Sequence, residues 1–166
     1  MIQELDHRLS RALFFGAKQS SSRRAVTIFL ARWLIIIMGA LVVLLTFLDV
    51  RRVALLALAL AFGWIVNSLL GKFYTRKRPY TTHGYKALIH TWLLGGSFPS
   101  DHAMMAAIFG SILFLLGGWW LWMAPLLIGG VMIGRVMAGV HYPSDVITGS
   151  IIGCLSVFGA YFLIFL

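Results

Sequence analysis

The sequence predicts an all-α membrane protein, a polytopic bundle of about five transmembrane helices preceded by an amphipathic interfacial helix. Hydrophobic residues make up 60% of the 166 residues and charged residues only 11%, which is far more apolar than a soluble domain of ordinary composition. Apolar runs of about 20 residues recur along the chain, and a helix of this length crosses the hydrocarbon core of a bilayer. Short polar stretches separate these runs.

The N-terminal helix is expected over residues 4–17. Its apolar side chains fall largely on one side and most of its charges, including Asp6, elsewhere, which is typical of a helix lying in the membrane interface. The apolar set is Leu5, Leu9, Ala12, Leu13 and Phe15. The expected spans follow over residues 25–48, 53–73, 99–116, 121–140 and 144–166. We therefore expect one domain over residues 1–166, with an interfacial segment at 1–24 and a transmembrane bundle at 25–166.

The formal net charge is +9, but many of the cations flank apolar runs. This placement favours membrane lipids and phosphorylated lipids as partners and argues against nucleic acid. Cys154 is the single cysteine, so no disulfide can form within the chain, and packing is its expected role.

Three polar clusters interrupt the apolar runs. Residues 72–79 hold four cations and no acid, residues 98–102 contain Asp101 and His102, and residues 134–145 contain Arg135, His141 and Asp145. Ionisable groups are costly in a membrane, so each cluster is a candidate functional site. With the spans above, all three clusters and the N-terminal helix lie on the same membrane face.

This combination of residues fits phosphoryl transfer. Arginine presents a planar fork of donors to phosphate oxygens, and the start of the third span, with the Ser100 hydroxyl, offers further donors. Asp145 follows His141 by four residues, a spacing that allows a carboxylate–imidazole hydrogen bond and makes His141 the candidate nucleophile. His102 is then available as the general acid. No spacing typical of metal ligands and no P-loop is present, and we expect no metal and no cofactor.

The three clusters resemble the motifs of the type-2 phosphatidic acid phosphatase family. The third motif, Ser-Arg-x5-His-x3-Asp, reads Gly134-Arg135-x5-His141-x3-Asp145, and the second, Pro-Ser-Gly-His, reads Pro99-Ser100-Asp101-His102. The first, Lys-x6-Arg-Pro, matches at Arg78-Pro79, but Lys72 comes one residue late, so Arg76 or Lys77 could take its place. The resemblance implies a metal-independent phosphatase with His141 as nucleophile, His102 as acid and Asp145 as the partner of His141. It also implies that Arg78, Arg135 and Ser100 bind phosphate.

The Pro-Ser-Asp-His variant and the short N-terminal part make the chain similar to the bacterial undecaprenyl-diphosphatase branch, known from bacitracin resistance. This implies release of phosphate from undecaprenyl diphosphate, which recycles the carrier lipid of peptidoglycan and cell-wall synthesis. It also implies a multi-pass protein of the bacterial cytoplasmic membrane whose site faces the outside. The positive-inside rule indicates the reverse orientation, because the site face carries the N-terminal cations and the opposite face only two arginines. These are Arg8, Arg11, Lys18, Arg23 and Arg24 against Arg51 and Arg52.

Several alternatives stay open at this point. The substrate could be phosphatidic acid or phosphatidylglycerophosphate, or the enzyme could be a lipid A phosphatase or phosphotransferase. A non-enzymatic anion or lipid-phosphate transporter could use the same cations but would need no His–Asp pair. Arg32 either snorkels to the interface or, with Arg76 and Lys77, binds a second phosphate. Asp101 is either a helix-start residue or a contact of the leaving group, whereas His7, His83 and His90 are interpreted as structural.

Overall fold

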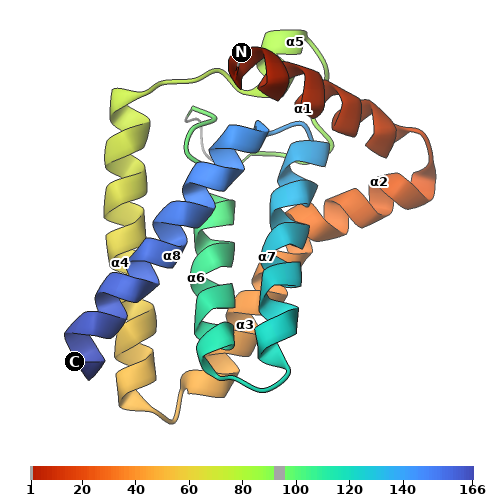
Figure 1. The fold of residues 1–166 in the computed structure, drawn as a ribbon. Helices are drawn as coiled ribbons and strands as arrows, with labels where there is room; N and C mark the ends of the chain where they lie inside the picture. The colour runs from red at the N-terminus through yellow and green to blue at the C-terminus, as the bar shows by residue number, and fades with distance from the viewer. Residues whose placement is uncertain (1, 92–95) are drawn as a thin grey trace.

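The computed structural model describes residues 2–91 and 96–166, and throughout these ranges the regular structure is helical. Figure 1 shows an upright bundle with two helices, α1 and α5, lying over its upper end. The helices are α1 (Ile2–Lys18), α2 (Ser21–Ile28), the π-helix η1 (Phe29–Trp33), α3 (Leu34–Thr46), α4 (Val50–Phe73), α5 (Pro79–His83), α6 (Asp101–Leu115), α7 (Trp120–Met137) and α8 (Pro143–Phe165).

Four helical segments are long and apolar enough to cross a membrane. They are the continuous run Ser21–Thr46, formed by α2, η1 and α3, and the helices α4, α7 and α8. The expected all-α membrane bundle is therefore confirmed, but the third expected span is shorter than the others. Helix α6 has 15 residues, or about 22 Å at 1.5 Å per residue, against about 30 Å of hydrocarbon.

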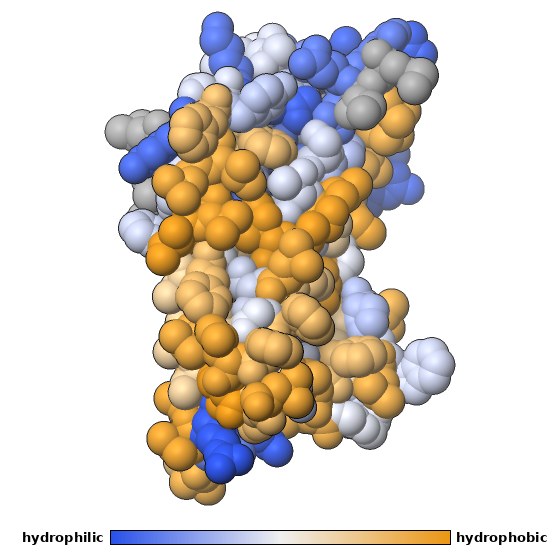
Figure 2. Space-filling view, turned by 60° about the vertical axis from the view of Figure 1, so that its left-hand side comes forward, coloured by the Kyte–Doolittle hydropathy of each residue, from blue (hydrophilic) through white to orange (hydrophobic). Residues whose placement is uncertain are grey.

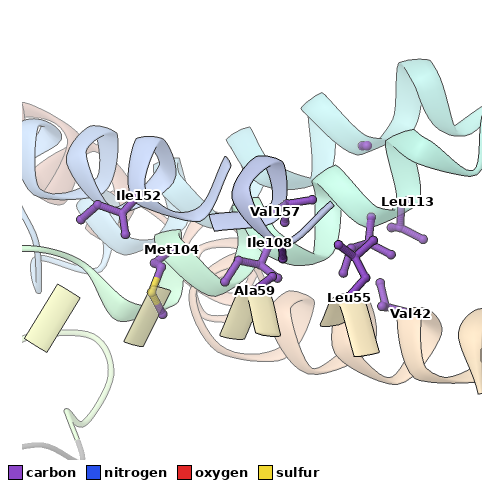
Figure 3. Packing of buried hydrophobic residues seen from close by; sticks show 11 residues of the cluster. Val42, Leu55, Ala59, Met104, Ile108, Leu113, Ile152 and Val157 are labelled. Atoms are coloured by element: carbon purple, nitrogen blue, oxygen red, sulfur yellow. The ribbon is translucent and has the colours of Figure 1, made fainter. Parts of the chain in front are cut away.

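Helix α6 tolerates this length because it is the centre of the bundle. It packs against α3, α4, α7 and α8, so other helices rather than lipid surround most of it. Figure 3 shows Met104, Ile108 and Leu113 of α6 meeting Ala59 of α4 and Val157 of α8 in one buried cluster. The outward side chains are apolar as well, and Figure 2 shows them as a broad belt with hydrophilic residues gathered at the upper end and a smaller patch at the lower end.

Glycines allow α8 to approach α6 at backbone distance. A Cβ added at Gly149 would lie 2.4 Å from the Ser100 carbonyl oxygen, and one added at Gly153 would lie 2.3 Å from the Met104 carbonyl oxygen. Small residues at this spacing are typical of helix pairs in membranes. This contact holds α8 against the start of α6, and these two helices begin with residues of the third and second motifs.

The two ends of the bundle differ in structure. At the lower end, Asp49 caps α4 by accepting hydrogen bonds from the amides of Arg51 and Arg52, and a short turn joins α6 to α7. At the upper end lie α1, α5, the start of α6 and the α7–α8 junction. The residues of all three polar clusters are therefore brought to the same end, as the alternation of spans predicts.

Helix α1 packs on the bundle through a different stripe from its apolar face. The buried stripe is Asp6, Ser10, Phe14 and Ala17, whereas Leu5, Leu9, Leu13 and Phe15 are exposed. The expected amphipathic helix is present, with its apolar face turned away from the protein. Its location in the membrane interface stays a prediction.

Candidate active site

A pocket at the upper end of the bundle brings the three polar clusters together. Its volume is about 90 Å³. Among the described residues, it is lined by Arg32, Arg78, Ile89, His90, Thr91, Asp101, His102, Arg135 and His141. Three arginines and three histidines thus face a single acid, which makes the pocket suited to an anion.

His141 lies in the junction between α7 and α8 and is 3% exposed. Its Nδ1 is 2.7 Å from the backbone carbonyl oxygen of Ser97. Because a carbonyl can only accept, this contact places the ring proton on Nδ1 and leaves the lone pair on Nε2. Burial lowers the pKa of His141 to about 4, and the charges of Arg135 and Arg78 act in the same direction against that of Asp145. The imidazole is therefore neutral at neutral pH, as a nucleophile must be.

Two arginines flank the free nitrogen of His141. Arg78 Nη1 is 3.4 Å and Arg135 Nη2 3.5 Å from Nε2. Arg135 is held by a hydrogen bond of 3.1 Å to the Ala31 carbonyl oxygen, and Arg78 by one of 3.3 Å to the Val140 carbonyl oxygen. Burial lowers the pKa of Arg78. Two guanidiniums held this close to one another and to a neutral imidazole can be balanced by an anion such as a phosphoryl group.

Asp145 supports His141 less directly than the spacing suggests. Its Oδ2 is 3.8 Å from His141 Nδ1, too far for a hydrogen bond, because the Ser97 carbonyl takes that donor. The carboxylate instead accepts from the Ser97 hydroxyl and the Tyr142 amide, and its other oxygen is 2.7 Å from Arg76 Nη1. Asp145 therefore holds Ser97, whose carbonyl orients the imidazole, and adds negative charge beside the ring.

The start of α6 contributes the second motif. His102 and Asp101 line the pocket, and Asp101 accepts a hydrogen bond of 2.7 Å from Asn67 of α4. Ser100 is fully buried, and its hydroxyl caps α6 by accepting from the Ala103 amide. The structure thus places Ser100 beneath the first turn of α6 and does not include it in the lining of the pocket.

The remaining expected cations separate into two groups. Arg32, on η1, lines the pocket. Arg76 lies outside it and forms salt bridges of 2.8 Å with Asp6 and 2.7 Å with Asp145. Lys72, in the last turn of α4, is exposed and does not line the pocket either. The structure therefore brings Arg32 to the phosphate pocket but neither Arg76 nor Lys72.

Sequence reasoning did not single out several residues of this end. Ser97 precedes the second motif by two residues, and its role depends on its backbone carbonyl, which no side-chain pattern reveals. Asp6 contacts Arg76 across the fold. His90 was interpreted as structural but lines the pocket with its neighbours Ile89 and Thr91. The one available signal was that these residues lie in the connection between the first and second motifs.

Close packing explains why the first position of the third motif is glycine in this chain. A Cβ on Gly134 would lie 2.7 Å from the backbone of Leu30 and Ala31 in the η1 region, so a serine does not fit. The same close approach lets Arg135 reach the Ala31 carbonyl and brings Arg32 to the pocket.

A larger cavity, of about 380 Å³, lies between α6, α7 and α8 towards the other end of the bundle. Among the described residues that line it, Ser111, Cys154 and Tyr161 are polar and none is charged. Of these two cavities, the smaller pocket is the candidate active site, because its described lining residues combine imidazoles with guanidiniums.

Comparison with known proteins decides the family. The model of the PAP2 superfamily matches residues 52–165, which include all three motifs. The chain belongs to the PAP2 superfamily. It is 31% identical over 147 residues to the bacitracin transport permease protein BcrC of Bacillus licheniformis, covering 84% of this chain and 70% of that protein.

Two further proteins of bacteria are similar. The undecaprenyl-diphosphatase BcrC of Bacillus subtilis is 38% identical over 95 residues, which cover 54% of this chain and 46% of that protein. The crystal structure of a transmembrane PAP2 type phosphatidylglycerolphosphate phosphatase from Bacillus subtilis has a TM-score of 0.73 at 23% identity, covering 98% of this chain and 85% of that one. This last likeness shows the fold. The chain is thus a multi-pass membrane protein of the PAP2 phosphatase family.

Proposed function

We propose that this PAP2 phosphatase, acting as a single domain over residues 1–166, hydrolyses undecaprenyl diphosphate to undecaprenyl phosphate and inorganic phosphate. The observation that carries the proposal is His141 Nε2, a neutral nitrogen held between Arg78 and Arg135. The relative named as the undecaprenyl-diphosphatase BcrC of Bacillus subtilis supports the choice of lipid.

In the proposed route the terminal phosphoryl group binds between Arg78 and Arg135, and His141 Nε2 attacks its phosphorus. A nitrogen–phosphorus bond forms as the bond to the bridging oxygen breaks, and His102 protonates that oxygen as undecaprenyl phosphate leaves. His102 then takes a proton from water, whose oxygen attacks phosphohistidine and releases inorganic phosphate. The guanidiniums neutralise the charge that develops on the phosphoryl oxygens in both steps.

A diphosphate is preferred over a monophosphate in this proposal because the pocket holds a third arginine. Arg78 and Arg135 flank the nucleophile, and Arg32 lines the same pocket from η1. Arg32 can thus bind the second phosphate of the substrate, which leaves as part of undecaprenyl phosphate. A phosphatidic acid, phosphatidylglycerophosphate or lipid A phosphatase is the alternative enzyme, and an anion transporter would have no use for the oriented tautomer of His141.

A panel of lipids presented to the purified protein in detergent micelles tests the proposal. We expect kcat/KM for undecaprenyl diphosphate to exceed that for undecaprenyl phosphate, phosphatidic acid and phosphatidylglycerophosphate by on the order of tenfold or more, as one additional charge-assisted hydrogen bond would give. Arg32→Ala should lower the rate with the diphosphate by a similar factor and leave the monophosphate rates nearly unchanged. Phosphate release is the measurement.

Arg51→Ala, at the other end of the bundle, is the matched control and should not change either rate. Equal kcat/KM values for all four lipids would overturn the choice of substrate. No release from any of them, in protein whose fold is intact, would overturn the enzymatic function.

A further inference from the structure

A chain of charged contacts joins the N-terminal helix to the proposed nucleophile. Asp6 of α1 forms a salt bridge of 2.8 Å with Arg76 Nη2, and Arg76 Nη1 is 2.7 Å from Asp145 Oδ1. The other oxygen of Asp145 lies beside the His141 ring. Asp6, which is 70 residues from Arg76 in sequence, is thus two contacts away from Asp145 and three from His141.

The contacts of Asp6 also hold the turn that carries His141. One carboxylate oxygen accepts a hydrogen bond of 3.0 Å from the Ser144 amide, and the other accepts from the Ser144 hydroxyl. The Arg76 guanidinium in turn lies 3.9 Å over the Tyr142 ring. Asp6 and Arg76 therefore contact Ser144 and Tyr142, the residues on the two sides of Pro143, directly after His141.

The network is buried, so its charges depend on one another. The side chains of Asp6, Arg76 and Asp145 are 6%, 14% and 0% exposed. Removing one charge from a buried ion network leaves the others poorly balanced. Without the Asp6 carboxylate, the whole charge of Arg76 would act on Asp145 and would weaken the negative field that Asp145 exerts at His141.

We propose that Asp6 is a positioning residue for catalysis, which makes helix α1 part of the active-site scaffold although none of the described α1 side chains lines the phosphate pocket. The proposal rests on the proposed function of His141. It also concerns a segment outside residues 52–165, the part that the family model matches. Asp6 acts through Arg76 and the turn at residues 142–145, by balancing the charge next to Asp145 and by fixing the path of the chain after His141.

Three variants separate this role from a general effect on the fold. Asp6→Asn should lower kcat on the order of 10- to 100-fold, as a small displacement of a reacting group does, with little change in KM because Arg32, Arg78 and Arg135 remain. Asp6→Glu should recover part of the loss. Glu4→Gln is the matched control, because Glu4 is an exposed acid of the same helix paired with Arg8, and it should behave as wild type.

A double-mutant cycle with Arg76→Gln tests the route of the effect. If Asp6 acts through Arg76, Asp6→Asn should cost much less in the Arg76→Gln background than alone. Full additivity, or a fall in thermal stability in detergent with kcat per folded protein unchanged, would overturn the proposal. A purely structural role would produce the second result.

Orthovanadate binding separates this proposal from the identity of the lipid. Vanadate mimics a phosphoryl group under attack, so its affinity depends on the orientation of the nucleophile and not on the lipid. Asp6→Asn should weaken vanadate binding about tenfold, whereas Glu4→Gln should not. If wild type binds vanadate but hydrolyses no undecaprenyl diphosphate, the choice of substrate is wrong while the role of Asp6 is still measured. Unchanged vanadate affinity in Asp6→Asn overturns the role of Asp6.

Discussion

The orientation of one imidazole decides which atom attacks. The Ser97 carbonyl accepts from His141 Nδ1, so Nε2 carries the lone pair and points to the same space as the guanidiniums of Arg78 and Arg135. His102 lines the pocket from α6, on a different helix from either arginine. This arrangement gives the two histidines distinct proposed roles, with His141 bonding to phosphorus and His102 moving protons.

We therefore predict a covalent phosphate on His141. When labelled substrate is mixed with the protein and quenched within milliseconds, wild type should give an acid-labile, base-stable phosphoprotein, as expected for a nitrogen–phosphorus bond. His141→Ala should abolish turnover, reducing it by at least about 10³-fold, while lipid binding stays nearly intact because the three arginines remain. Asp145→Asn should be slowed severely, since it loses the charge beside the ring.

His102→Ala is the informative companion variant. It should accumulate the phosphoprotein if the loss of the base slows hydrolysis more than formation. Label that maps to Ser100, or substantial turnover by His141→Ala, would contradict the assignment. We expect no label on Ser100, because its hydroxyl caps α6 and its side chain is fully buried.

Most of the pocket could be predicted from residue types and spacing, and one contact could not. Arg78, Asp101, His102, Arg135 and His141 were all expected near one another, because the alternation of spans brings their helix ends to one face. The direct bond between Asp145 and His141 was expected from their spacing of four residues. The structure replaces it with a carbonyl from residue 97, and a backbone group 44 residues away along the chain leaves no trace in a side-chain pattern.

At the scale of helices, apolar runs predicted the helices of the bundle but not the short helix α5, and they predicted lengths less well than existence. The first expected span, 25–48, corresponds to the continuous helical run Ser21–Thr46, which starts earlier because Ser20 caps it and ends two residues earlier, before the cap residue Phe47. The π-helix η1 within it has no signature in composition. Helix α6 is shorter than the expected 99–116 because Ser100 is its N-cap, with Pro99 before it, and Leu116 is its C-cap.

The close contact of α8 with α6 yields a prediction about stability. In Gly153→Ala, the new methyl group would lie 2.3 Å from the Met104 carbonyl oxygen, a backbone atom that cannot rotate away. The two helices must separate, so we expect a loss of about 1–3 kcal/mol, typical of overpacking. The apparent melting temperature in detergent, followed by tryptophan fluorescence, should fall accordingly.

Gly159→Ala is the matched control on the same helix. A Cβ at Gly159 meets no atom within 4 Å, so this variant should melt at the wild-type temperature or slightly above it, because alanine is the better helix former. Equal melting temperatures of the two variants would contradict a backbone-distance contact between α6 and α8. Since this contact also fixes the second motif against the third, Gly153→Ala should lose activity at temperatures below its melting point.

The whole molecule presents two ends of unequal charge. The end with the site carries most cations of the described chain, and the opposite end carries Arg51 and Arg52 beside Asp49. Three of the site-end arginines, Arg32, Arg78 and Arg135, line the phosphate pocket, and Arg76 is paired with two carboxylates. These four arginines serve the site and its scaffold, so they should be left out when the positive-inside rule is used to infer which end lies in the cytoplasm.

We predict that the site faces the outside of the bacterial cytoplasmic membrane, as the resemblance to undecaprenyl-diphosphatases implies. Thr81→Cys in a Cys154→Ser background places one thiol on the exposed surface of α5, beside the site. It should react with a membrane-impermeant maleimide in intact spheroplasts. Val50→Cys in the same background is the matched control, because Val50 is 80% exposed at the opposite end of the bundle, and it should react only after lysis. The reverse pattern would place the site in the cytoplasm, in agreement with the N-terminal cations, and would require a cytoplasmic lipid phosphate as the substrate.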